Sequence, residues 1–200
     1  MNLSPTTHVS LLLRLSDPND REAWGCFVGL YAPLVYWFFR RRSLQDADAA
    51  DLTQEVLRVV IQRAKSFSHH GGRGAFRAWL FSIARNHLRR FLAKSQHRRR
   101  LSGDYVALEC LEEIAAPEEE VRLWEQEYER SVFAWASQQV RQRVNPSTWD
   151  AFWRTAVEGK SGEQTAAALG LTPGAVYVAK SRVMARLRAL VEEIEEREGN

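Results

Sequence analysis

The sequence contains little of what stabilises secreted, metal-binding or membrane-spanning proteins. Its 200 residues include two cysteines, Cys26 and Cys110, and neither has a second cysteine nearby. They match neither a disulfide framework nor the spacing of a metal site, so we expect a reducing cytosol. We also expect no cofactor. The apolar run at residues 11–13 is too short for a signal peptide, and no run approaches the ~20 residues of a membrane span. We therefore expect a cytoplasmic protein that makes no membrane contact.

The sequence also lacks the apolar–polar alternation of β-strands over any useful length. Apolar residues instead recur at helical spacing nearly throughout, including residues 21–42, 46–61 and 76–92. Within the first of these segments Pro33 is expected to kink or divide the helix, and the glycine-rich stretch 66–75 is expected to be a loop. The predicted fold is all-α, with two small helical domains joined by an acidic linker: a first domain over residues 1–95, the linker over 96–117 and a second domain over 118–200.

The net charge of +3 hides a strong segregation of sign along the chain. Residues 85–100 include seven basic side chains and no acidic one, whereas residues 104–129 include ten acidic side chains and one basic. From 160 to 188 the sign reverses, with five basic residues and one acidic. Such blocks indicate separate electrostatic tasks, at least one of them facing a polyanion. The acidic block alone would also be explained by a linker that stays extended through self-repulsion.

The most specific local signal lies in the segment "SGEQTAAALGLTPGAVYVAKSRVMARLRAL". Ser161 and Gln164 have the spacing of a capping box, and Gly170 suits a left-handed helix C-terminus. Thr172 can cap the next helix, with Pro173 at its first position. Two short helices separated by a tight glycine turn predict a helix-turn-helix motif.

The second helix of this motif divides into two faces at 100° per residue. Its buried stripe is predicted to contain Val176, Ala179, Val183 and Leu187. The outward set is Gly174, Tyr177, Val178, Ser181, Arg182 and Ala185, with Lys180 at the boundary. In a helix-turn-helix, the outward residues in the N-terminal half of the second helix enter the major groove. The alternative is an αα-hairpin that packs without touching DNA.

The segment "DADAADLTQEVLRVVI" also predicts an amphipathic helix, but one of opposite charge. Its apolar arc contains Leu52, Val56, Leu57, Val59 and Val60. The other face carries carboxylates and amides: Asp48, Asp51, Gln54, Glu55, Arg58 and Gln62. This face is either simply solvated or binds a protein, because it would repel DNA.

The motifs "DLTQEVLRVV", "FRAWLFSIARNHLRRFL" and "GEQTAAALGLTPGAVYVAKSRV" occur in an order that resembles the bacterial sigma factors of RNA polymerase. The resemblance is to the sigma-70 family, and within it to the small extracytoplasmic-function (ECF) type built from regions 2 and 4. It covers nearly the whole chain. It implies a protein that is not an enzyme but a DNA-binding initiation subunit, which binds core RNA polymerase and directs promoter-specific transcription. Proteins of this type are often held inactive by an anti-sigma factor, which is therefore a candidate partner.

The resemblance also implies roles for individual residues. The face formed by Asp48, Asp51, Gln54, Glu55, Arg58 and Gln62 would dock on the clamp helices of the largest polymerase subunit. Recognition and melting of the −10 promoter element fall to Phe67, His69, His70, Arg73, Ser82, Arg85, Asn86 and Arg89. Recognition of the −35 element falls to Thr172, Gly174, Tyr177, Val178, Lys180, Ser181, Arg182 and Arg186. The acidic linker would thread into the polymerase channel that later holds RNA.

Some assignments stay open at the level of sequence. Many members of the family carry basic residues where this chain has Tyr177, Val178 and Ala179, so the −35 readers are not identified. The loop at 66–75 could be a flexible surface loop, and its adjacent His69 and His70 have no Cys, Asp or Glu nearby to complete a metal site. The helix at 76–92 is expected to bury Phe76, Trp79, Leu80, Ile83 and Phe91.

Two other classes of DNA-binding protein compete with this interpretation. An ordinary helix-turn-helix regulator would explain the C-terminal half but leaves "DLTQEV" and "FRAWLFSIARNHLRR" without a purpose. An enzyme acting on DNA, such as a serine recombinase, would require a sheet-containing catalytic domain, and nothing in the sequence predicts a sheet. Promoter-specific transcription with core polymerase would separate a sigma factor from an ordinary regulator.

Overall fold

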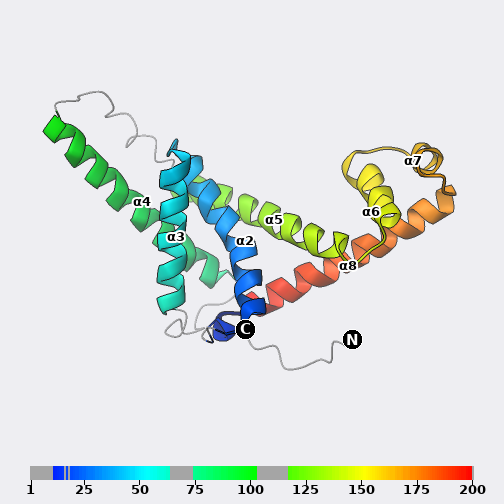
Figure 1. Cartoon of the computed structure of the whole chain (residues 1–200), viewed down its shortest axis with the longest axis horizontal. Helices are drawn as coiled ribbons and strands as arrows, with labels where there is room; N and C mark the ends of the chain where they lie inside the picture. The colour runs from blue at the N-terminus through cyan, green and yellow to red at the C-terminus, as the bar shows by residue number, and fades with distance from the viewer. Residues whose placement is uncertain (1–10, 16, 18, 64–73, 103–116, 200) are drawn as a thin grey trace. The chain divides into compact units, whose positions relative to one another are not determined.

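The computed structural model describes residues 11–15, 17, 19–63, 74–102 and 117–199 of the chain. Every regular element in these ranges is helical, which confirms the predicted all-α fold (Figure 1). The elements are α1 (Leu11–Arg14), α2 (Arg21–Arg40), α3 (Asp46–Arg63), α4 (Ala75–Ser102), α5 (Pro117–Arg141), α6 (Pro146–Phe152), the π-helical turn η3 (Trp153–Val157), α7 (Gly162–Leu169) and α8 (Pro173–Gly199).

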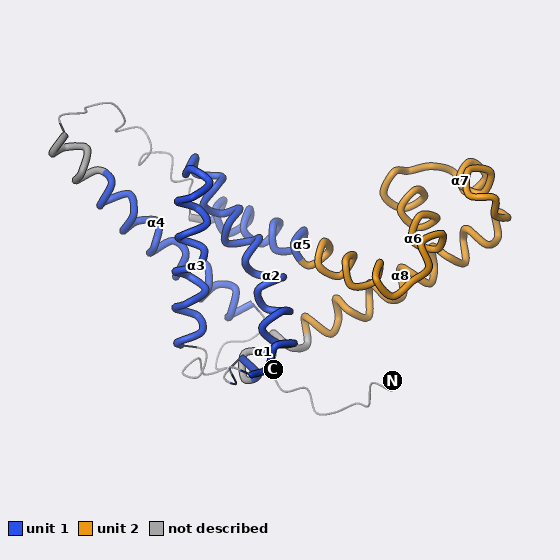
Figure 2. The backbone as a smooth tube through the Cα atoms, viewed as in Figure 1, with its two compact units in different colours: residues 1–131, 196–200 blue, residues 132–195 orange. Residues whose placement is uncertain are grey.

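The chain forms two compact units, shown in different colours in Figure 2. Unit 1 comprises residues 1–131 and 196–200, and unit 2 comprises residues 132–195. This division falls within α5, later than the predicted start of the second domain at residue 118. The helix α4 continues to Ser102, seven residues into the predicted linker of 96–117. Residues 103–116 of that linker lie outside the described part of the chain, and its last residue, Pro117, begins α5, so the acidic linker stays a prediction.

Unit 1 is built around the apolar faces of α2, α3 and α4. The fully buried residues of α2 include Phe27, Leu30, Leu34 and Phe38. The helix α2 is not divided at Pro33, contrary to one of the two outcomes expected for that residue. Burial of two turns of large side chains on either side of Pro33 outweighs the ~3 kcal/mol that an internal proline costs a helix.

The helices α3 and α4 bury most of the apolar residues that their helical periodicity predicts to be buried. Leu52, Val56 and Val60 of α3 are buried, whereas Leu57 and Val59 at the edges of the predicted arc are half-buried. In α4 the buried residues are Phe76, Leu80, Phe81, Ile83, Ala84 and Leu88. Of the residues predicted for the α4 core, Trp79 and Phe91 are only half-buried. The buried face of α4 is therefore rotated, relative to the predicted one, toward Phe81, Ala84 and Leu88. The rotation arises because α4 packs against more than one neighbouring helix.

The first turns of α5 belong to unit 1 and complete its core. Trp124 is 1% exposed, and its ring centroid lies 5.6 Å from that of Phe38 in α2 and 5.4 Å from that of Phe81 in α4. One turn later, Tyr128 stacks on Tyr31 of α2 at 6.2 Å. Aromatic side chains from three helices thus meet in one cluster, which explains why the boundary between the units lies after these residues.

Unit 2 contains the remainder of α5 together with α6, α7 and most of α8. One core cluster joins α5, α6 and α8 through Ala136, Val140, Trp149, Phe152, Val183 and Leu187. A second cluster joins α6, α7 and α8 through Ala151, Ala166, Val176 and Ala179. The small residues of this second cluster allow the helices to approach closely, which is the arrangement that a helix-turn-helix requires.

Candidate protein-binding and nucleic-acid-binding surfaces

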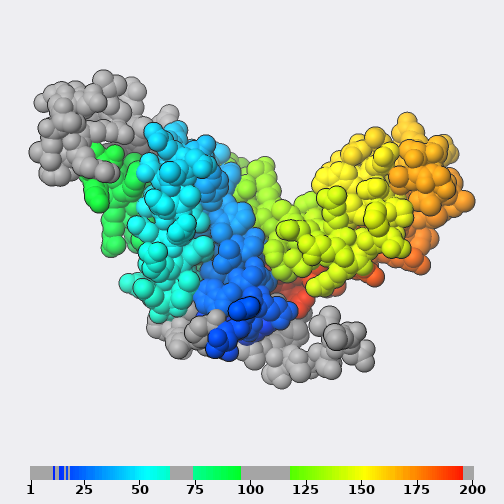
Figure 3. All heavy atoms as spheres, in the orientation of Figure 1, coloured from blue at the N-terminus to red at the C-terminus, as the bar shows by residue number. Residues whose placement is uncertain are grey.

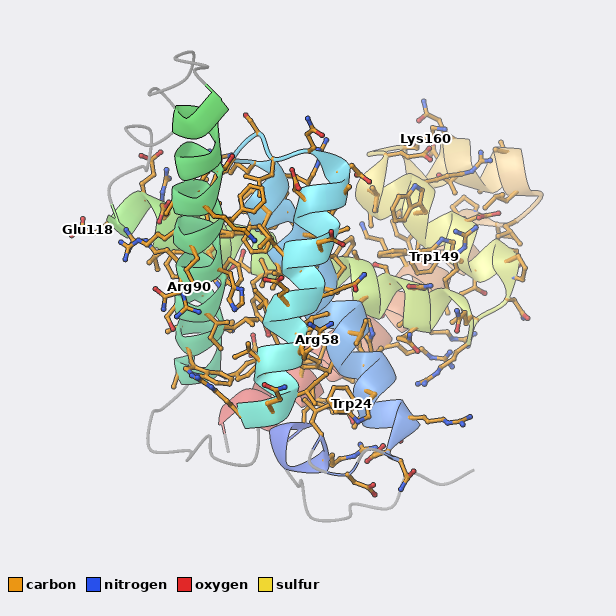
Figure 4. All side chains as sticks on the ribbon, turned by 60° about the vertical axis from the view of Figure 1, so that its left-hand side comes forward. Trp24, Arg58, Arg90, Glu118, Trp149 and Lys160 are labelled. Atoms are coloured by element: carbon orange, nitrogen blue, oxygen red, sulfur yellow. The ribbon has the colours of Figure 1, made fainter. Side chains whose placement is uncertain are left out.

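The helix α3 turns its predicted polar face outward. Asp51, Gln54, Glu55, Arg58 and Gln62 are exposed and Asp48 is half-buried, whereas Ala49, Leu52, Thr53, Val56 and Val60 of the same helix are buried. We call the six polar residues the acidic face of α3. It lies along a helix that is open to solvent over its length in the space-filling view (cyan in Figure 3), and Arg58 marks it in Figure 4. The structure thus brings the whole predicted protein-binding set onto one surface.

Contacts with neighbouring helices hold this face in place. The Tyr36 hydroxyl of α2 donates a hydrogen bond to the Asp46 carboxylate in the first turn of α3. This hydrogen bond raises the pKa of Tyr36 above its usual value. Nine residues after Asp46, the Glu55 carboxylate lies 3.2 Å from Nδ1 of His87 in α4. Sequence reasoning missed His87, because its approach to Glu55 depends on how α3 and α4 pack.

The outer side of α4 carries part of the predicted −10 set. Ser82, Asn86 and Arg89 are exposed, as is the neighbouring Arg90, which Figure 4 labels. The Ser82 hydroxyl donates to the backbone oxygen of Trp79 at 2.7 Å. These side chains form a polar and basic surface that can contact phosphates and base edges. The other predicted −10 residues, Phe67, His69, His70 and Arg73, lie outside the described residues.

Arg85 differs from its neighbours on α4 because it is directed toward α5. Its Nε lies 3.5 Å from the Oε2 atom of Glu120, whose side chain is 3% exposed. Glu120 also accepts a hydrogen bond from the guanidinium of Arg42, which lies in the turn after α2. Burial lowers the pKa of Arg42, and the contact with Glu120 opposes that shift. One buried carboxylate thus serves two guanidinium groups, and Arg85 is 25% exposed rather than open to solvent.

Sequence reasoning missed this cluster of Arg42, Arg85 and Glu120. Glu120 appeared only as one of many acidic residues in the block at 104–129, with no feature that separated it from Glu118 or Glu119. Those two neighbours are exposed. Helical periodicity offers one weak signal, because Glu120, Trp124 and Tyr128 recur every four residues and therefore share one face.

The helix-turn-helix has the capping that its sequence predicts. The Ser161 hydroxyl accepts a hydrogen bond from the Gln164 backbone, and the Gln164 side chain accepts one from the Ser161 backbone, both at 3.1 Å. Gly170 ends α7 with φ 65°, in the left-handed region. The Thr172 hydroxyl accepts from the Ala175 backbone at 3.2 Å, at the start of α8. The caps therefore fix where α7 ends and α8 begins.

The two predicted faces of α8 are both observed. Val176, Ala179, Val183 and Leu187 are buried, and the predicted outward residues Gly174, Tyr177, Val178, Ser181, Arg182 and Ala185 are exposed. Lys180 is half-buried, as expected for a boundary position, and Thr172 is exposed. Arg186 is exposed and donates from Nη1 to the backbone oxygen of Arg143 at 2.9 Å, which ties its side chain to the turn after α5.

The described ranges also bear on metal binding and on membrane spanning. They contain no cluster of three or more His, Cys, Asp or Glu side chains able to hold a metal ion. None of the helices described is both long and apolar enough to span a lipid bilayer. The candidate surfaces are the acidic face of α3, the outer side of α4 and the outward face of α8.

Comparison with known proteins matches the helices that carry two of these surfaces, α3 and α4, to one family. Residues 27–99, which cover most of α2, all of α3 and nearly all of α4, match the family described as Sigma-70 region 2. A curated relative, the ECF RNA polymerase sigma factor ShbA of Streptomyces griseus subsp. griseus, is 29% identical over 196 residues. That alignment covers 94% of this chain and 97% of the relative.

Solved structures similar to this chain come from complexes of two proteins. One is described as the RsbN–BldN complex, with 23% identity, a TM-score of 0.34 and coverage of 90% of this chain and 98% of that one. Another is CnrH in complex with the cytosolic domain of CnrY, with 21% identity, a TM-score of 0.36 and coverage of 91% and 95%.

Proposed function

Because the chain belongs to the sigma-70 family of RNA polymerase sigma factors, in its extracytoplasmic-function group, we propose that three separate surfaces carry its work in transcription initiation. The acidic face of α3 binds core RNA polymerase through the clamp helices of the largest subunit. The outer side of α4 binds and opens the −10 element, and the outward face of α8 binds the −35 element. In this proposal the chain performs no catalysis itself.

The observation that carries the proposal is the exposure of the acidic face of α3. An amphipathic helix could have hidden these groups in contacts within unit 1, but Asp51, Gln54 and Glu55 are all exposed. A surface of carboxylates and amides repels DNA phosphates, so its partner is a protein with complementary basic groups. Charged residues at such a surface favour rapid and specific association.

The DNA-binding part of the proposal rests on charge and on the helix-turn-helix. The exposed side of α4 carries Arg89 and Arg90, and the outward face of α8 carries Arg182 and, at its edge, Lys180. Cationic side chains on exposed helical faces provide the phosphate contacts that position a protein on DNA. The α8 face has the orientation of a recognition helix, because its opposite stripe packs on α6 and α7.

The polymerase contact is tested by reversing charge on the acidic face. We expect Asp51→Lys combined with Glu55→Lys to reduce the amount of core polymerase retained in a pull-down at least tenfold, while the far-UV circular dichroism is unchanged. The fold should survive because Glu55 makes only an exposed contact with His87. The matched control is Glu119→Lys with Glu129→Lys, which makes the same charge change at two exposed residues of α5.

The control separates loss of a specific surface from a general effect of charge. If both double variants retain core polymerase equally well, the acidic face of α3 is not the docking surface. If the control loses binding as much as the test variant, net charge rather than this face determines the interaction. Transcription in vitro from mapped start sites, with core polymerase and the wild-type chain, provides the positive reference.

A further inference from the structure

The first two turns of α8 present small and apolar side chains to solvent. Gly174, Ala175, Tyr177 and Val178 are all exposed, with Tyr177 at 59% and Val178 at 49%. None of the four carries an amide or a cation. Side chains able to form hydrogen bonds or ion pairs with bases, apart from the Tyr177 hydroxyl, begin only with Lys180 and Ser181. The part of the helix that enters a major groove first is therefore mainly apolar.

Tyr177 is held to one side of this face by α7. A β-carbon placed on Gly162, the first residue of α7, would lie 2.8 Å from both Cζ and the hydroxyl oxygen of Tyr177. Such a distance means that the Tyr177 ring packs directly on the Gly162 backbone. The ring thus lies over the start of α7, at the flank of the recognition helix. Val178, one position later, is left as the apolar side chain on the centre of the outward face.

The surroundings of Val178 leave space for a base edge. Gly174 lies one helical turn before it and has no side chain, and its β-carbon position would meet nothing within 4 Å. Arg182 lies one turn after it and is exposed. Residues four apart share a helix face, so Gly174, Val178 and Arg182 follow one another along the face. The arrangement is a gap, an apolar group and a cation in succession.

We propose that Val178 is a specificity-determining residue that reads the C5-methyl group of a thymine in the −35 element. The inference rests on the proposed binding of that element by α8. The thymine methyl is the apolar group that base pairs present in the major groove. A valine offers no donor or acceptor, so any polar base edge placed against it would lose hydrogen bonds to water without replacement. Val178 therefore favours thymine and disfavours the other bases at its position.

The test removes the methyl group without changing the base pair. Holoenzyme formed from core polymerase and the full chain is first used to select −35 sequences from a randomised promoter library. Each selected thymidine is then replaced by deoxyuridine, whose base lacks only the C5-methyl group. The affinity of the holoenzyme for the duplex is measured at one fixed salt concentration. We expect one such replacement to weaken wild-type binding about fourfold, as loss of one methyl contact implies.

Two variants assign the effect to Val178. Holoenzyme containing Val178→Ala should bind the thymine duplex about fourfold more weakly than wild type and should not distinguish deoxyuridine from thymine at that position. The matched control is Val157→Ala, the same substitution at a residue with 46% exposure that belongs to η3 and not to α8. It should retain the wild-type affinity and the wild-type response to deoxyuridine.

Each other outcome has a definite meaning. If no selected thymine responds to deoxyuridine, or if Val178→Ala responds as strongly as wild type, Val178 does not read a methyl group, although the −35 assignment of α8 stands. If the selection enriches no sequence at all in the −35 region, α8 does not read the promoter, and the proposed function of this helix and the role of Val178 fail together.

Discussion

Glu120 offers the sharpest test of how unit 1 is held together. Its side chain is 3% exposed and contacts Arg42 and Arg85, whose side chains are 19% and 25% exposed. The substitution Glu120→Gln preserves the shape but leaves two guanidinium groups without their common counter-charge. Removing one partner of a fully buried ion pair costs about 3–5 kcal/mol. Because both arginines keep some contact with water, we expect the free energy of unfolding of unit 1 to fall by about 2–3 kcal/mol.

Urea denaturation provides the measurement. Trp124 packs in the same region of the core, between Phe38 and Phe81, so tryptophan fluorescence and circular dichroism can both follow the transition. With a urea dependence of about 1–3 kcal/mol per molar, the midpoint should fall by about 1 M. The neighbouring variant Glu119→Gln changes an exposed carboxylate and should stay within about 0.5 kcal/mol of wild type. Equal stabilities for Glu120→Gln and Glu119→Gln would refute the reasoning.

A double-mutant cycle in the free energy of unfolding tests whether Arg85 is paired with Glu120 or available for DNA. Arg85 is both a proposed −10 contact and a partner of Glu120. If the pair is formed in solution, Glu120→Gln and Arg85→Met should show a coupling energy of about 1 kcal/mol or more. Additive effects of the two substitutions would mean that the Arg85 side chain does not depend on Glu120 and is free for DNA.

Two remaining predictions concern DNA binding and acid stability. Arg89→Ala should weaken promoter binding and reduce the slope of log affinity against log salt concentration by about 1. The control Arg122→Ala, at an exposed residue of α5, should leave this slope unchanged. Equal slopes for the wild type and both variants would mean that Arg89 does not contact the DNA. The hydrogen bond from Arg14 lowers the pKa of Asp20 to about 2 from 3.8, so its ionised form stabilises the fold above pH 4 and this contribution is lost as the pH falls toward 2. Asp20→Asn keeps a cap for the Ala23 backbone but carries no charge, and it should lose less stability than wild type between pH 4 and 2; identical acid transitions would contradict this.

The sequence by itself determined the elements whose causes are local. The caps of α7 and α8 depend on residues three positions apart, such as Ser161 and Gln164, and the αL turn depends on the conformational freedom of Gly170. The burial of Val176, Ala179, Val183 and Leu187 follows from helical period alone. The same period separated the acidic face of α3 from Leu52, Val56 and Val60. These features could be predicted because each arises within a few turns of one helix.

The tertiary structure alone decided the features that join distant parts of the chain. The pairing of Glu55 with His87, the cluster of Glu120 with Arg42 and Arg85, and the packing of Tyr177 on Gly162 each join residues that belong to different elements of the fold. Packing also kept α2 unbroken through Pro33. A periodic pattern states which side of a helix is apolar but not which helix covers it. The identity of the partner depends on how several helices together exclude water, and that is a property of the folded chain.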